Sequence, residues 1–128
     1  PKSYEFNENE PREFAFCKDA EGNWDVDHPN YKFWNHLEEV ISQLQEMDIE
    51  SDLILFHPYD RWGFSKLAPE QNETYLRYLV RRLSAFPGIW WSMANEYDLC
   101  FAKSKEEWYK IEEIIKEEDV YDHLLSNR

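Results

Sequence analysis

Glycine and cysteine are scarce in this sequence, and their scarcity excludes two kinds of structure. The 128 residues contain three glycines, Gly22, Gly63 and Gly88, which lie far apart. They cannot form the glycine-rich loop that holds a phosphate group, so a nucleotide-binding fold of the dinucleotide type is excluded. The two cysteines, Cys17 and Cys100, are too few for a disulfide framework. We interpret them as unpaired thiols, with a single bridge as the alternative.

Basic residues and long apolar runs are scarce as well. Lys and Arg number 14 against 27 Asp and Glu, which gives a formal net charge of −13 and disfavours binding to nucleic-acid phosphates. No stretch approaches the roughly 20 apolar residues that cross a membrane. The four histidines lack a ligand spacing such as H-x-x-x-H, so a structural metal site is not expected. We therefore predict no cofactor and no metal, and neither nucleic acid nor membrane as a partner.

Aromatic residues, by contrast, are abundant. They make up 17% of the chain, with six Trp and eight Tyr, and the hydrophobic fraction of 42% excludes disorder. The length suits one domain with a core of its own. Aromatic rings in such numbers fit a carbohydrate-binding surface, where the flat apolar faces of sugars stack on them, although core packing accounts for some.

A strand followed by a helix recurs along the chain. Strand-like runs begin near Leu53, Ile89 and Leu124, roughly 35 residues apart, as in successive βα units of a parallel sheet. Ser104 and Glu107 form a capping box at the start of one helix. We therefore predict an α/β fold with parallel strands and flanking helices. Amphipathic spacing places the helices at 31–47, 70–86 and 105–118.

The first 30 residues show no clear period. Polar and aromatic residues alternate irregularly there, which predicts a long loop before the first helix. Loops of this length are usually functional or disordered, and the aromatic content favours an ordered, functional loop.

The segment 89–98, Ile-Trp-Trp-Ser-Met-Ala-Asn-Glu-Tyr-Asp, is the most informative. Its apolar run stops at Asn95 and Glu96, and the carboxyl end of a parallel strand is where loops converge on a ligand. Glu96 is a candidate proton donor, and Asn95 could hydrogen-bond a sugar hydroxyl. The alternatives are that Glu96 caps the next helix or pairs with an arginine such as Arg61, and that Asn95 is a turn residue.

A second polar and aromatic cluster follows the preceding strand. Residues 53–56, Leu-Ile-Leu-Phe, read as a strand buried on both faces, and the cluster after it reads as a binding loop. Consecutive βα units are usually neighbours, so His57, Asp60 and Trp62 should approach Glu96. A structural histidine is the alternative for His57.

These two segments resemble a known family. "LILFHPYDRWGF" followed by "IWWSMANEYD" is similar to the apiosidase-like glycoside hydrolases. Their clan contains retaining (β/α)8-barrel glycosidases with an Asn-Glu pair at the end of the fourth strand. The resemblance extends from "PKSYEFNENEP" to "KEEDVYDHLLS". It implies that residues 1–128 form a single partial TIM barrel covering strands 2–5. Residues 1–30 would be an active-site loop after the second strand, with "PKSY" as the tail of that strand, and "HLLSNR" would begin the fifth.

The resemblance also assigns roles to individual residues. Glu96 would be the catalytic acid/base, and Asn95 would hold the 2-hydroxyl of the sugar. Trp91 lies in the apolar run before the pair and Tyr97 follows it directly, and we add both to the residues that would bind substrate. The full candidate set for substrate binding is Asn95, His57, Tyr59, Asp60, Trp62, Trp91 and Tyr97.

The sequence departs from the family pattern in one respect, because it stops before the seventh strand, which carries the nucleophilic Glu. A whole barrel takes about 250 residues, so we expect a glycoside hydrolase fragment that is inactive alone. A non-catalytic carbohydrate-binding domain is the alternative function. Exposed sheet edges predict a homo-oligomer. The chain begins with Pro1 and shows no leader, which suggests a processed or excised piece and leaves the compartment open, cytoplasmic or secreted.

Overall fold

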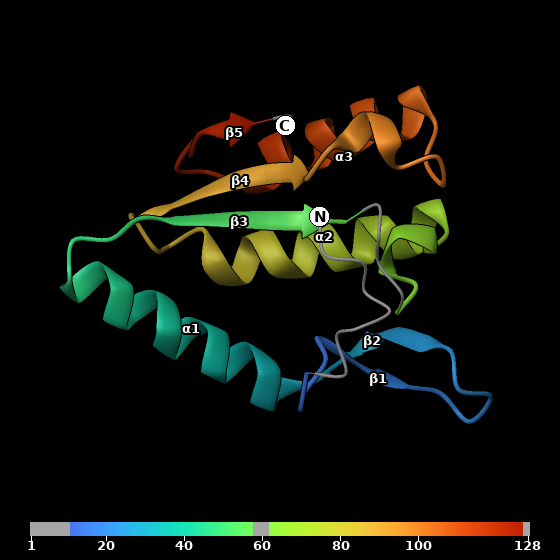
Figure 1. Ribbon diagram of the computed structural model, residues 1–128, viewed down its shortest axis with the longest axis horizontal. Coiled ribbons are helices and arrows are strands. Elements are labelled where there is room, and N and C mark those ends of the chain that lie inside the picture. Colours follow the sequence, from blue (N-terminus) through green and yellow to red (C-terminus); the bar gives the residue numbers. More distant parts are fainter. Residues whose placement is uncertain (1–10, 58–61, 127–128) are drawn as a thin grey trace. The chain divides into compact units, whose positions relative to one another are not determined.

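The chain divides into two compact units. The structure, a computed structural model, describes residues 11–57 and 62–126 (Figure 1). One unit comprises residues 1–37 and the other residues 38–128, and each is treated by itself. The predicted tail of the second barrel strand, residues 1–4, lies outside the described residues. The helices and strands are β1 Phe16–Lys18, β2 Trp24–Pro29, α1 Tyr31–Glu46, β3 Ser51–Phe56, η2 Phe64–Lys66, α2 Pro69–Leu83, β4 Ile89–Ala94, η3 Tyr97–Leu99, α3 Lys105–Glu118 and β5 Leu125–Ser126.

The first unit contains a short antiparallel hairpin of β1 and β2. The turn is closed by the Asp19 carboxylate, which accepts hydrogen bonds from the amides of Glu21 and Asn23, and by Gly22 at a φ of 84°. The hairpin lies inside the segment 1–30, for which the sequence predicts a loop. Its strands were missed because they are short and do not alternate regularly between apolar and polar residues.

The second unit contains a parallel sheet in the order β3-β4-β5. The register runs from Ser51 opposite Ile89 to Phe56 opposite Ala94, and β5 pairs with the middle of β4. β3 and β4 therefore point the same way, with their carboxyl ends at the same edge (Figure 1). The predicted strands and their parallel pairing are confirmed, but β3 is not buried on both faces as predicted, because Ile54 is exposed.

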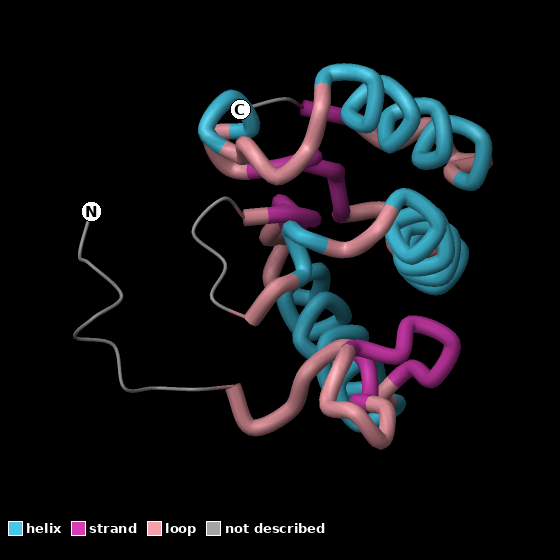
Figure 2. Tube along the Cα trace, turned by 90° about the vertical axis from the view of Figure 1, so that its right-hand side faces the viewer, coloured by secondary structure: helices cyan, strands magenta, loops and turns pink. Residues whose placement is uncertain are grey.

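Helices α2 and α3 pack against each other on one side of this sheet (Figure 2). Most of their buried residues are apolar ones at helical spacing, such as Leu76, Val80 and Ile111. The hydroxyl of Tyr75 donates to the carbonyl of Leu55 over 2.9 Å and so ties α2 to β3. The α/β class with parallel strands and flanking helices is confirmed.

The helix boundaries agree with the sequence to within one residue except at the end of α2. That helix was predicted to reach residue 86 but ends at Leu83. Phe86 precedes Pro87, and a residue before proline is sterically disfavoured in the helical conformation. The capping box of α3 is confirmed, since the Ser104 hydroxyl accepts from the Glu107 amide and the Glu107 carboxylate accepts from the Ser104 amide. Within 11–57 and 62–126, no helix is long and apolar enough to span a membrane.

Candidate active site

At their carboxyl ends, β3 and β4 are linked by one further backbone hydrogen bond after the last residue pair of the sheet. Phe56 and Ala94 face each other in the register, and the Asn95 amide then donates to the Phe56 carbonyl over 3.4 Å. His57 and Asn95 therefore leave the sheet side by side, and both are partly exposed. The expectation that the two strands are neighbours is confirmed, and it brings His57 to the Asn95-Glu96 pair.

Glu96 has a backbone conformation that residues other than glycine seldom adopt. Its φ of 52° lies in the left-handed region, which costs an L-residue with a side chain about 1 kcal/mol. The turn ends β4, and the Glu96 carbonyl then accepts from the Leu99 amide over 2.9 Å to start η3. The Glu96 side chain is exposed. A carboxylate held on a strained turn at a strand end is an arrangement frequently found at functional sites.

Trp62 follows β3 in the sequence and is another candidate residue of the site. It lies in the connection that follows β3, just before Gly63, whose φ of 94° turns the chain into η2. The side chain of Trp62 is partly exposed. Tyr59 and Asp60, the other candidates of this loop, lie outside the described residues. The backbone of Tyr97 forms the first residue of η3.

Trp91 is placed away from this edge. It is fully buried, and its indole N–H donates to the Asp119 carboxylate over 2.8 Å. It also lies four positions before Asn95, which is about 13 Å along an extended strand. Because side chains alternate between the two faces of a strand, the sequence pattern could not show that this indole points into the core. Trp91 has no surface to offer a sugar, and we do not carry it into the site.

The comparisons with known proteins show the family of this chain. Residues 4–126 match the family model described as "Apiosidase-like, catalytic domain". This chain belongs to the apiosidase-like family. The assignment rests on nearly the whole chain and confirms the resemblance that the two strand-end segments predicted.

A solved structure is also similar to this apiosidase-like chain. It is a crystal structure of a "putative glycoside hydrolase" from Bacteroides vulgatus ATCC 8482, 43% identical, with a TM-score of 0.85. The similarity covers 93% of this chain and 25% of that one, so the apiosidase-like chain spans a quarter of that protein's length. No curated protein matches.

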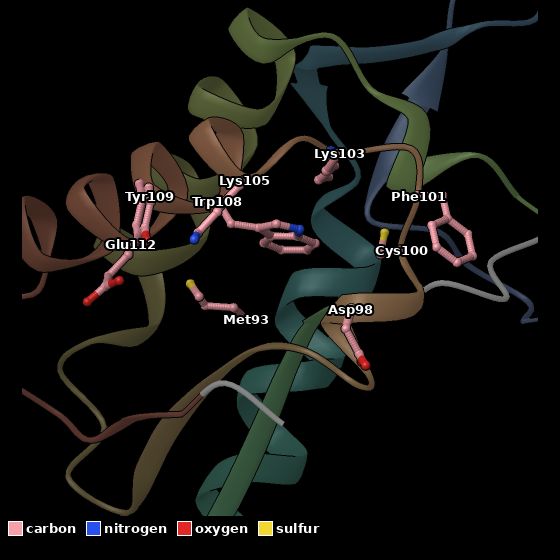
Figure 3. Close-up of a pocket in the computed structure, with 9 residues that line it drawn as sticks. All are labelled: Met93, Asp98, Cys100, Phe101, Lys103, Lys105, Trp108, Tyr109 and Glu112. Atoms are coloured by element: carbon pink, nitrogen blue, oxygen red, sulfur yellow. The ribbon is translucent and has the colours of Figure 1, made fainter.

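In the apiosidase-like chain, a cavity of about 500 Å³ is lined by the end of β4, by residues of the segment 98–103 and by helix α3 (Figure 3). Met93 of β4 and Asp98 of η3 line one part of it, and Trp108 and Glu112 of α3 line another. Lys103 also lines this cavity. The cavity mixes apolar walls with charges of both signs, and Asp98 and Lys103 of the loop that carries Glu96 form part of its wall.

Lys103 is the polar residue of this region that sequence reasoning missed. It is 6% exposed, and burial lowers the pKa of its ammonium below the ordinary value. Lysines are almost never buried without a partner, so a single Lys in the segment 99–104 is expected at the surface, and its burial could not be predicted from the sequence. In the part of the chain that the structure describes, no group of three or more His, Cys, Asp or Glu is placed to hold a metal ion.

Proposed function

We propose that this apiosidase-like chain carries the acid/base half of a retaining glycoside hydrolase site. The chain would form roughly strands 2–5 of a (β/α)8 barrel. The parallel order β3-β4-β5 with two helices on one face supports this architecture. So does the similarity to a quarter of a longer chain described as a glycoside hydrolase.

The Asn95-Glu96 turn at the carboxyl end of β4 is the observation that carries the proposal. Glu96 is exposed on a left-handed turn, and Asn95 is hydrogen-bonded to the end of β3. In the proposed mechanism the Glu96 carboxyl protonates the departing glycosidic oxygen. It then takes a proton from the water that releases the sugar, as a retaining mechanism requires. Asn95 binds a sugar hydroxyl.

The substrate of the proposed site is a carbohydrate glycoside. His57 and Trp62 come from the end of β3, and Tyr97 follows Glu96 directly. A histidine ring can hydrogen-bond hydroxyls, and an indole face stacks on the apolar face of a sugar. Tyr59 and Asp60 join this set on the sequence alone.

A retaining enzyme needs a second carboxylate about 5–5.5 Å from the first. We propose that this nucleophile belongs to a part of the enzyme outside the present 128 residues. Protonating a leaving group achieves little without a group that attacks the anomeric carbon. The 128-residue chain alone is then expected to be inactive.

Glu96→Gln in the full-length enzyme tests the proposal. General acid catalysis contributes about 10²- to 10⁴-fold, and it matters most when the leaving group is a poor one. We expect kcat/KM to fall by about that factor for alkyl glycosides and much less for nitrophenyl glycosides. Glu106→Gln, an exposed neighbour on α3, is the matched control. Equal activity of Glu96→Gln and wild type on alkyl glycosides would exclude Glu96 as the acid.

A further inference from the structure

A buried ammonium group lies beneath the loop that carries Asn95 and Glu96. Lys103 Nζ donates to Oδ1 of Asn72 over 3.0 Å, and it lies 4.6 Å from the ring centroid of Phe56. Asn72 is 3% exposed and Phe56 is 2% exposed. A single side chain from the β4–α3 loop, residues 95–104, therefore reaches both α2 and the last residue of β3.

Holding a cation in this place is unfavourable for stability. A buried charge costs free energy unless it is paired and hydrogen-bonded. In the described residues, no carboxylate lies within ion-pair distance of Lys103; a neutral amide and an aromatic face hold the ammonium group, and Glu107 attracts it only from farther away. A methionine would fill similar space without that cost. Lys103 therefore adds little to stability, and its buried contacts are better explained as a way to specify the conformation of the loop.

Two contacts connect Lys103 to the proposed site. The ring of Phe56 lies under the ammonium group, and the carbonyl of the same residue accepts the hydrogen bond from the Asn95 amide. Lys103 also donates its backbone amide to the Cys100 carbonyl over 3.1 Å, which closes the end of the loop. The start of the loop is therefore fixed to Phe56 at the backbone, and its end is fixed to Phe56 and Asn72 through the lysine.

We propose that Lys103 is a positioning residue, which sets the conformation of the β4–α3 loop and thereby the orientation of Glu96. The catalytic part of this inference rests on the proposed function, whereas the positioning part concerns the loop alone. Lys103 itself touches neither sugar nor nucleophile in this proposal. Its charge fixes one loop conformation because an ammonium group needs both the amide oxygen and the ring face.

Amide hydrogen exchange of the 128-residue chain tests the positioning role. In Lys103→Met we expect the amides of Asn95 and Leu99 to exchange at least tenfold faster. The amide of Trp91, bonded to the Leu124 carbonyl within the sheet, should be unchanged. Lys105→Met is the control, because that lysine lines the same cavity but lies near the ring of Tyr109 instead. A folded Lys103→Met with wild-type exchange at Asn95 would overturn the proposal.

A second variant keeps the test decisive if Lys103→Met does not fold. Asn72→Ala removes the amide that accepts from the lysine and leaves the ammonium in place. We expect the same selective loss of protection at Asn95 and Leu99. Wild-type protection of both amides in folded Asn72→Ala would count against the role of Lys103.

Kinetics of the full-length enzyme separate this role from a purely structural one. For Lys103→Met we expect kcat to fall at least tenfold with KM within twofold of wild type, while Lys105→Met leaves both unchanged. Unchanged kcat in Lys103→Met would overturn the catalytic consequence of the positioning. An enzyme that hydrolyses no glycoside would instead refute the proposed function, and the exchange experiment would still decide whether Lys103 positions the loop.

Discussion

The indole N–H of Trp91 donates to Oδ2 of Asp119 over 2.8 Å, with both residues buried. The same carboxylate accepts from the backbone amide of His123 over 2.8 Å, and its Oδ1 lies 2.9 Å from the ring nitrogen Nδ1 of His123. The other ring nitrogen lies 2.9 Å from the Phe86 carbonyl. One carboxylate thus joins the central strand to the segment that follows α3.

Asp119→Asn should destabilise the fold substantially. The substituted amide oxygen can still accept from Trp91 and the His123 amide, but the NH2 group at the other position cannot accept from the Tyr121 amide, which the carboxylate does over 3.2 Å. Leaving buried polar groups unsatisfied costs about 1–3 kcal/mol each. We expect urea unfolding followed by tryptophan fluorescence to show a loss of about 2 kcal/mol. Asp122→Asn, the same change at an exposed neighbour, is the control, and an equal loss in both variants would contradict the assignment.

Acid should weaken the same network. Burial by itself would raise the pKa of Asp119, but the hydrogen bonds from Trp91 and His123 outweigh it and lower the pKa below its ordinary value. In the unfolded chain an aspartate carboxyl has a pKa of about 3.9. The folded form then binds fewer protons, so this contribution is present above about pH 4 and is lost as the pH falls through the folded pKa. The stability difference between wild type and Asp119→Asn should therefore shrink below about pH 4, and a constant difference down to acid unfolding would be inconsistent with this linkage.

The ion pairs between α2 and α3 make a second, salt-dependent contribution. Arg81 Nε lies 2.6 Å from Oε2 of Glu118, and Arg77 Nη1 lies 2.7 Å from Oε1. The hydrogen bonds from Arg81 and Arg77 lower the pKa of Glu118 to about 2. The stability that Glu118 contributes is present above its unfolded pKa of about 4.3 and is lost toward pH 2.

Glu118→Gln should accordingly lower the urea midpoint at neutral pH, and more so at low ionic strength than in about 1 M NaCl, where charges are screened beyond about 3 Å. Glu113→Gln breaks an exposed pair with Lys110 on one helix and should have a small effect, as surface pairs usually do. Equal midpoint shifts for the two variants would mean that the bridge between the helices adds nothing to stability.

The sequence predicted the helices and strands whose apolar residues follow a regular helical spacing or form a continuous run. Helix α3 was assigned with the correct boundaries because apolar residues recur every three or four positions and because Ser104 and Glu107 mark its start. Strand β4 was recognised as an apolar run that ends at Asn95. The neighbouring position of β3 followed from the rule that consecutive βα units are adjacent.

Features that depend on tertiary contacts could not be predicted in this way. Trp91 and Trp90 follow one another in the sequence, and nothing there shows which indole turns inward to Asp119. Lys103 has the composition of a surface loop residue, and its burial depends on Asn72, 31 positions away. The hairpin depends on a turn closed by Asp19, whose side-chain contacts leave no periodic signal.

The edges of the parallel sheet lead to a last prediction. In the described sheet, β3 and β5 are the outer strands, and Ile54 of β3 is 51% exposed. Unpaired strand edges and exposed apolar residues next to them favour association with another copy. We expect the 128-residue chain to form dimers or larger oligomers in multi-angle light scattering. The net charge of −13 opposes this association, so the oligomeric fraction should rise with salt because screening weakens the repulsion.

Ile54→Lys tests whether the sheet edge is the surface responsible. A charge on an edge strand is a common way for proteins to prevent pairing, so this variant should shift the equilibrium toward monomer. Met47→Lys introduces the same charge at a residue that is 61% exposed just after α1, and it should leave the distribution nearly unchanged. If both variants dissociate the oligomer equally, association depends on net charge and not on the sheet edge. A wild-type chain that is monomeric at all salt concentrations would show that these edges do not pair.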